Sequence, residues 1–148
     1  MKTILFVCTG NTCRSPMAEI MLKKKLKLAG IDGIKVSSAG LCANVGDRIS
    51  PEAAQALRIM GYRLYAFKSK RADGKTLIKS DIVICMTERH KRAISAFPNV
   101  YTVKEITGVP DVPDPYGYGI REYVETSCVL EDVCNIILNK IIEGELFK

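Results

Sequence analysis

The sequence predicts an α/β fold, a small doubly wound sheet of four parallel strands with helices on both faces. Short apolar runs rich in β-branched residues alternate with longer segments of helical spacing, which is typical of βα units. The 148 residues suit one domain, and the 47% hydrophobic content is that of a chain with a packed core. We therefore expect a single domain over residues 1–148.

Each predicted strand is a short apolar run enriched in β-branched or aromatic side chains. The four runs cover residues 3–8, 34–38, 81–86 and 100–103.

The helices between the strands have recognisable starts, where a hydroxyl residue that can cap a helix precedes Pro or Glu. These starts are Ser15-Pro16, Ser50-Pro51 and Thr87-Glu88. Gly30 and Gly61 are expected to end the first two helices. A last helix over residues 121–143 has apolar side chains at helical spacing, so it should pack across the sheet.

The cysteine content favours reactive or reduced thiols over a disulfide framework. The chain has six cysteines and one histidine, and no two cysteines are spaced as C-x-x-C, so we expect no zinc site or other metal centre. No secretory cleavage site follows the first apolar run, and the cytosol keeps thiols reduced. We therefore expect a cytoplasmic protein.

Charge and hydropathy limit the partners of the chain. The longest apolar run covers residues 4–8, far short of the roughly 18 residues of a spanning helix, so no membrane association is expected. The net charge is +6, but the charges are mostly scattered, and the lysines of residues 23–27 lie in an amphipathic segment. We interpret them as a solvated helix face and expect no nucleic acid; a smaller anion suits the charge equally well.

Two segments interrupt the alternation of strands and helices. Residues 39–49 form a loop of small residues, and residues 107–120 form a loop rich in Pro, Gly and Tyr that is too long for a simple connection. Both follow predicted strands, and ligands bind at the carboxyl ends of strands in open parallel sheets. The segment after the first strand should lie at the same edge.

That segment combines Cys8, Arg14 and Ser15 in the pattern C-x5-R-S, between a strand and a helix start. Backbone N–H groups of such a loop converge on an anion, and phosphate is the anion that fits best. Gly10 and Asn11 can adopt the left-handed conformations that the loop demands. The Arg14 guanidinium can hold two phosphoryl oxygens. We expect these donors to lower the pKa of Cys8 and to make it a nucleophile toward phosphorus.

The run from Cys8 to Glu19, C-T-G-N-T-C-R-S-P-M-A-E, resembles the active-site loop of the low-molecular-weight protein tyrosine phosphatase family. A second family motif, D-P-Y/F-G, stands at residues 114–117. The resemblance extends over essentially the whole chain and includes Ser38-Ala39-Gly40 and residues 81–87. It implies a flavodoxin-like fold of the phosphotyrosine phosphatase I type.

The resemblance also implies the catalytic roles. Cys8 would attack phosphorus and form a phosphocysteine, while Arg14 stabilises the equatorial oxygens. Asp114 would protonate the leaving group and then activate water, although Asp111 is a nearby competing carboxylate. This route needs no metal or other cofactor.

The remaining implied site residues surround the phosphate. Ser15 would donate a hydrogen bond to the Cys8 sulfur, and Ser38 would brace Asn11. The Cys13 counterpart in the family can form a reversible disulfide with the nucleophile. Substrate contacts are expected from Thr9, Gly10, Asn11, Thr12, Cys13, Ser15 and Tyr116.

Thr12 bears on the choice of leaving group. Phosphotyrosine-selective members of the family typically have a bulky apolar residue at this position, whereas members with Thr resemble bacterial protein arginine phosphatases. A hydroxyl leaves room and a polar partner for a guanidinium. Eukaryotic-type members often have two adjacent aromatic residues after the D-P pair, whereas here Tyr116 is followed by Gly117. We expect phosphorylated proteins as substrates, with phosphoarginine mildly favoured over phosphotyrosine.

Two alternative functions share this type of loop. Arsenate reductases need further relay cysteines, but the residues after Cys85 contain none nearby, and Pro16 stands where reductases tend to have Gln. A non-enzymatic phosphoryl-carrier domain would lack Arg14 and Asp114. His90 and the other cysteines are expected to be packing or surface residues, and the protein a monomer or weak dimer.

Overall fold

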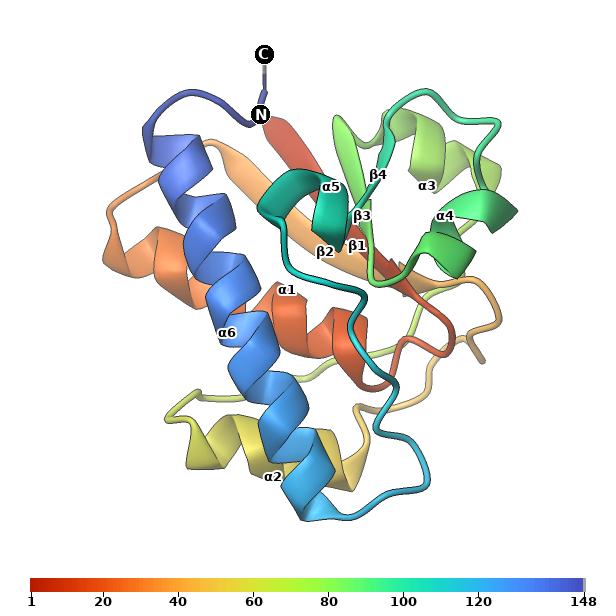
Figure 1. Cartoon of the computed structure of the whole chain (residues 1–148), viewed down its shortest axis with the longest axis vertical. Helices are drawn as coiled ribbons and strands as arrows, with labels where there is room; N and C mark the ends of the chain where they lie inside the picture. The colour runs from red at the N-terminus through yellow and green to blue at the C-terminus, as the bar shows by residue number, and fades with distance from the viewer. Residues whose placement is uncertain (148) are drawn as a thin grey trace.

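The computed structural model describes residues 1–147 and contains one sheet of four parallel strands in the order β2-β1-β3-β4 (Figure 1). This arrangement confirms the predicted fold class. The strands are β1 (Lys2–Cys8), β2 (Ile34–Gly40), β3 (Ile82–Cys85) and β4 (Val100–Thr102). The central strand β1 is buried from Ile4 to Cys8, because helices cover both faces of a doubly wound sheet.

The helices form two layers, one on each side of the sheet (Figure 1). One layer contains α1 (Arg14–Leu28), α2 (Pro51–Ile59) and α6 (Ile120–Ile142), and the other contains α3 (Gly74–Lys79) and α4 (Glu88–Ala93). A further short helix, α5 (Val103–Thr107), follows β4. Side chains alternate along β1, so Ile4 and Phe6 face the first layer while Leu5 and Val7 face the second.

The predicted helix starts are right at two positions and wrong at one. Ser50 and Thr87 cap α2 and α4, and their hydroxyl oxygens accept the backbone N–H of Ala53 and His90. Ser15 is not a cap: α1 begins at Arg14, and the residue before it, Cys13, makes no side-chain cap bond. The Ser15 hydroxyl lies inside the helix, where it contacts a buried thiol instead. As predicted, Gly30 and Gly61 follow the ends of α1 and α2 with positive φ angles of 70° and 88°.

The sequence analysis missed two short helices, α3 and α5. Helix α3 begins after Asp73, whose carboxylate accepts the N–H of Thr76, and α5 begins with a capping box between Thr102 and Glu105. Each helix has six residues or fewer, too few to repeat an apolar pattern. Val103 therefore belongs to α5 and not to the last strand. None of the helices within residues 1–147 is long and apolar enough to cross a membrane.

Candidate active site

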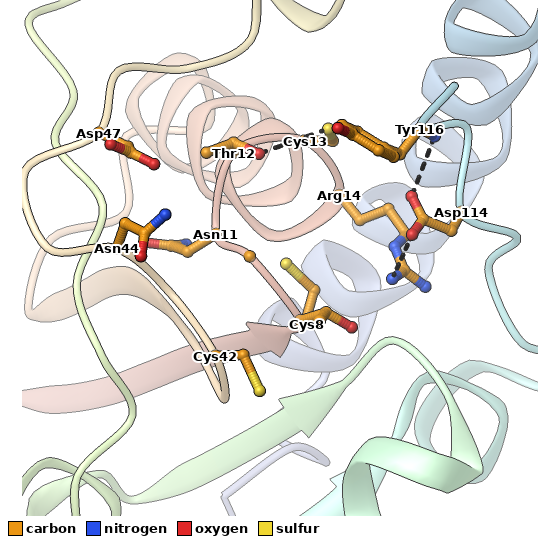
Figure 2. A pocket seen from close by; sticks show the side chains of 12 residues that line it. Cys8, Asn11, Thr12, Cys13, Arg14, Cys42, Asn44, Asp47, Asp114 and Tyr116 are labelled. Carbon is orange, nitrogen blue, oxygen red and sulfur yellow. Dashed lines mark hydrogen bonds and ion pairs between the residues drawn. The ribbon is translucent and has the colours of Figure 1, made fainter. Parts of the chain in front are cut away.

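A pocket of about 340 Å³ lies at the carboxyl end of the sheet, where three segments meet (Figure 2). We call residues 8–14, between β1 and α1, the phosphate loop, and residues 108–119, between α5 and α6, the acid loop. The third segment follows β2 and supplies Cys42, Asn44 and Asp47 to the opposite wall. The phosphate loop lines the pocket along its whole length, and the acid loop contributes Asp114 and Tyr116.

Asn11 holds the phosphate loop in shape. Its φ of 54° is the only positive φ of a non-glycine residue within 1–147, whereas Gly10 does not adopt the left-handed conformation predicted for it. The Asn11 amide Nδ2 donates to Ser15 Oγ at 2.9 Å and to Ser38 Oγ at 3.0 Å, so the expected bracing by Ser38 is present. Asn11 Oδ1 also accepts the Lys70 N–H at 2.9 Å. The buried side chain thus makes three hydrogen bonds, which fix this residue in its strained backbone conformation.

Two further residues contact the same loop, and the sequence analysis gave neither of them a role there. The Ser69 hydroxyl, which is 1% exposed, donates to the Asn11 carbonyl at 2.8 Å. A Cβ at Gly40 would lie 2.5 Å from the Thr9 carbonyl oxygen, so only glycine permits β2 to approach the loop this closely.

Cys8 lies at the base of the pocket and is almost completely buried. Its Sγ is 2.8 Å from Ser15 Oγ, the contact that the family resemblance implies. Burial raises the pKa of the Cys8 thiol, while the Ser15 hydroxyl, backbone N–H groups and the Arg14 guanidinium act to lower it. The predicted lowering of the pKa is therefore wrong, because it counted the donors and omitted the loss of water around the sulfur.

Arg14 connects the phosphate loop to the acid loop. Its Nη1 donates to the Val112 carbonyl at 3.0 Å, and its Nη2 lies 3.6 Å from Asp114 Oδ2. The guanidinium is buried, whereas half of the Asp114 side chain is exposed. Asp114 Oδ1 accepts the Tyr116 N–H at 3.1 Å, which orients the carboxylate (Figure 2). The arrangement places a fixed cation and a solvent-accessible carboxylate on one wall of the pocket.

The two candidate acids have different positions. Asp111 does not line the pocket, and its two carboxylate oxygens both accept the Glu88 N–H at 3.2 Å. It is thus held at the start of α4, while Asp114 lines the same pocket as Cys8.

The other predicted contact residues divide into two groups. Thr9, Gly10, Thr12, Cys13 and Tyr116 line the pocket, with Tyr116 76% exposed at its rim. Ser15 does not line it, because its buried hydroxyl lies behind the Cys8 sulfur. Ser15 is placed to contact Cys8 and Asn11 and not a substrate.

His90 is not the isolated packing or surface residue expected from the sequence. The side chain is 4% exposed, and its Nε2 and Nδ1 lie 2.9 and 3.0 Å from the hydroxyls of Thr9 and Thr87. Burial, assisted by nearby Arg14, lowers the pKa of His90 to about 4, so the ring is neutral at neutral pH. It therefore joins Thr9, the residue after Cys8, to the start of α4.

A buried carboxylate beneath the loop was also missed. Glu19 on α1 is 3% exposed, and its Oε1 accepts the Ser38 hydroxyl at 2.8 Å. Its other oxygen accepts the Tyr65 hydroxyl and the Lys23 ammonium. Glu19 thus extends the network that begins at Asn11 as far as the surface.

Comparison with known proteins identifies the family. Residues 3–145 match the family model described as low molecular weight phosphotyrosine protein phosphatase. A protein-arginine-phosphatase of Bacillus subtilis is 37% identical, over 88% of this chain and 90% of the relative. A low molecular weight protein-tyrosine-phosphatase, PtpB of Staphylococcus haemolyticus, is 35% identical, over 83% of this chain and 88% of the relative.

Solved structures agree with the sequence matches. A mutant of the YwlE arginine phosphatase with a phosphorylated active-site serine superposes with a TM-score of 0.90 and 33% identity, covering 99% of both chains. The chain therefore belongs to the low molecular weight phosphotyrosine protein phosphatase family and is a cysteine-dependent protein phosphatase.

Proposed function

We propose that this phosphatase hydrolyses phosphoarginine in proteins in preference to phosphotyrosine. The observation that carries the proposal is Thr12, which places a hydroxyl and no large apolar group in the lining of the pocket. The named relatives include both a protein-arginine-phosphatase and protein-tyrosine-phosphatases, so family membership alone leaves the leaving group open.

In the proposed mechanism, the Cys8 thiol, whose pKa is raised by burial, gives its proton to the bound phosphoryl dianion. The resulting thiolate forms a bond to phosphorus while the bond from phosphorus to the leaving group breaks. Arg14 and the N–H groups of the phosphate loop hold the equatorial oxygens during this transfer. Asp114 gives its proton to the leaving group, and as a carboxylate it then takes a proton from the water that cleaves the phosphocysteine. Ser15, 2.8 Å from the sulfur, donates a hydrogen bond to the departing thiolate. The phosphorylated serine of the solved arginine phosphatase mutant supports a covalent intermediate on the nucleophile's atom.

Asp114 is proposed as the acid because its position suits both steps. It borders the pocket, half of its side chain is exposed, and it lies near the guanidinium that would hold the phosphoryl group. Asp111 is occupied at the start of α4.

Neither the reductase nor the carrier alternative gains support. Cys85 is fully buried and burial raises its pKa to about 12, while Arg14 and Asp114 are both at the pocket.

The proposed selectivity depends on which side chain lies next to the leaving group in the pocket. The phosphoryl contacts are the same for a phenol and a guanidine, so Cys8, Arg14 and Asp114 do not distinguish them. A threonine hydroxyl can pair with a guanidinium N–H group, whereas a branched alkyl group would leave that donor without a partner in the pocket. An apolar side chain would instead pack against a phenyl ring.

Replacing Thr12 with isoleucine is expected to reverse this preference. The variant should lose phosphoarginine activity selectively and keep or gain phosphotyrosine activity. The ratio of the two kcat/KM values should change by roughly 10- to 200-fold, the usual effect of such a change in a pocket. The measurement compares matched phosphoarginine and phosphotyrosine peptides in wild type and variant.

Two conservative variants separate bulk from hydrogen bonding. Thr12→Ser keeps the hydroxyl and should keep the wild-type ratio, whereas Thr12→Val removes the hydroxyl with little added bulk and should shift the ratio part of the way. If the ratio is the same in wild type and Thr12→Ile, or if the wild type does not cleave phosphoarginine, phosphotyrosine is the substrate and the proposal is wrong.

We further propose that the whole chain forms one phosphatase domain that acts on phosphorylated proteins in the cytoplasm, as a monomer or weak dimer, without membrane or nucleic acid. All six cysteines within residues 1–147 are free, and reduced thiols suit that compartment. No group of three or more His, Cys, Asp or Glu residues in this part of the chain is arranged to hold a metal ion.

Peroxide is expected to inactivate the enzyme reversibly through Cys8 and Cys13, which line the same pocket. Peroxide would oxidise the Cys8 sulfur to a sulfenic acid with release of water, and the Cys13 thiol would then displace a second water to form a disulfide. After mild peroxide and then a reducing thiol, wild type should regain most of its activity and Cys13→Ser much less. Cys42→Ser, which changes an exposed thiol of the same pocket, should behave as wild type. Equal recovery of Cys13→Ser and wild type would exclude the protective role.

A further inference from the structure

The acid loop separates two hollows. Asp114 lines the active-site pocket on one side and a second groove of about 370 Å³ on the other. Tyr116 faces the active site, and Tyr118, two residues along the loop and 66% exposed, lines the groove. Residues from the first turns of α6 form the far wall of this groove. A polypeptide bound in the active site therefore needs to cross only one loop to reach the groove.

The groove combines an apolar wall with negative charge. Pro113, Pro115, the Tyr118 ring and Val129 provide the apolar surface. Glu122 and Glu125 add carboxylates from successive turns of α6. Such a lining suits a long side chain with an apolar stem and a cationic end, because the stem can pack on proline and valine while the charge lies near carboxylates and an aromatic ring.

The two carboxylates are not equivalent. Glu125 already pairs with Arg121 at 3.3 Å, on the exposed surface of α6. The Glu122 carboxylate forms no ion pair or side-chain hydrogen bond with any residue in 1–147, and its residue is half-buried. Glu122 is therefore the carboxylate that is available to an added cation.

We propose that this groove binds a lysine or arginine side chain of the substrate polypeptide, close in sequence to the phosphorylated residue. The inference rests on the protein phosphatase activity and holds for either leaving group. Charge complementarity supports it: the chain as a whole carries a net charge of +6, which would repel a basic substrate segment, and the groove offers carboxylates directly beside the catalytic pocket. The shared wall at Asp114 places the groove directly next to the pocket where the phosphorylated residue must bind.

The test measures kcat/KM for phosphopeptides that carry Lys, Ala or Glu at each of the two positions before and after the phosphorylated residue. We expect wild type to favour Lys over Ala at one or more of these positions by roughly 3- to 10-fold, mainly through KM, and the preference should weaken at high salt. Glu122→Gln should remove most of this preference. Both peptide chemistries are used, phosphotyrosine and phosphoarginine, and the Lys to Ala ratio is taken within each one, so the result does not depend on the choice of leaving group.

Three controls separate the groove from other effects. A small aryl phosphate occupies only the active site, so its turnover by Glu122→Gln should equal that of wild type and also show that the variant is folded. Glu143→Gln makes the same charge change just beyond the far end of α6 and should leave the Lys preference intact. Tyr118→Leu keeps apolar contact without the aromatic ring and should reduce the preference in the same direction as Glu122→Gln.

Several outcomes would overturn the proposal. These are the absence of a Lys preference in wild type at all four positions, equal effects of Glu122→Gln and Glu143→Gln, or an equal loss of activity on all substrates in Glu122→Gln. A groove that instead serves as an interface between two copies of the chain would be recognised by a concentration-dependent dimer that Tyr118→Leu dissociates, without any Lys preference.

Discussion

Replacing Cys8 with serine is expected to abolish turnover, with a loss in kcat on the order of 10⁴-fold or more. The serine hydroxyl would occupy the position of the sulfur at the base of the pocket, next to the Ser15 hydroxyl that lies 2.8 Å from the wild-type sulfur. An alcohol is far less acidic than a thiol, so the serine attacks slowly, and any phosphoserine that forms, as in the solved arginine phosphatase mutant, would persist because an alkoxide is a poor leaving group. The variant should therefore bind phosphate and fail to turn it over.

Binding of inorganic phosphate, followed by calorimetry, shows whether the loop of the variant is intact. It should remain within a few-fold of wild type, since Asn11 and Arg14 keep their contacts. Cys128→Ser makes the same atomic exchange on the exposed face of α6 and should keep full activity. Turnover of Cys8→Ser above a few per cent of wild type would mean that Cys8 is not the nucleophile.

The main parts of the fold could be predicted because each long element repeats its pattern. The strand β1 is buried on both faces, so its apolar run is continuous, and α6 has 23 residues in which the apolar spacing recurs. The helices α3 and α5 are too short to repeat an apolar pattern. Their starts are marked only by the capping residues Asp73 and Thr102, and Asp and Thr are also common in turns.

The error at Ser15 has a physical cause. A serine before proline is a good helix cap, but here the hydroxyl is used by a neighbouring thiol and amide, and α1 begins one residue earlier, at Arg14. No side chain caps the helix, which leaves its N-terminal N–H groups directed toward the phosphate loop. A general capping rule does not take account of a loop whose function needs those donors.

The parts of the site that could be predicted are contiguous in the sequence. The phosphate loop is one run of residues, and the acid loop has its own short motif. The supporting contacts join residues far apart: Thr9 and His90 are separated by 81 positions, and Asn11 and Ser69 by 58. No local pattern indicates such pairs, because each partner is an ordinary polar residue until the fold buries it.

Arg14→Lys is expected to reduce kcat/KM by about 10³-fold, even though the positive charge is kept. Two separate nitrogens of the guanidinium contact the Val112 carbonyl at 3.0 Å and the Asp114 carboxylate at 3.6 Å, so Arg14 holds the acid loop against the phosphate loop. The planar guanidinium can still present N–H groups to two phosphoryl oxygens, which a single ammonium cannot do with the same geometry. The loss therefore combines weaker transition-state stabilisation with a less well positioned acid.

These two contributions can be distinguished by the leaving group. An activated aryl phosphate needs no protonation, so its turnover by Arg14→Lys should report only the weaker hold on the phosphoryl group, and a phosphopeptide with a poor leaving group should lose additional activity. Arg58→Lys, the same exchange at an exposed position near the end of α2, should leave both substrates unaffected. Equal losses on the two substrates would show that Arg14 acts on the phosphoryl group alone and that its contact with Asp114 has no part in proton transfer. Near-normal kcat/KM on both would remove Arg14 from the mechanism.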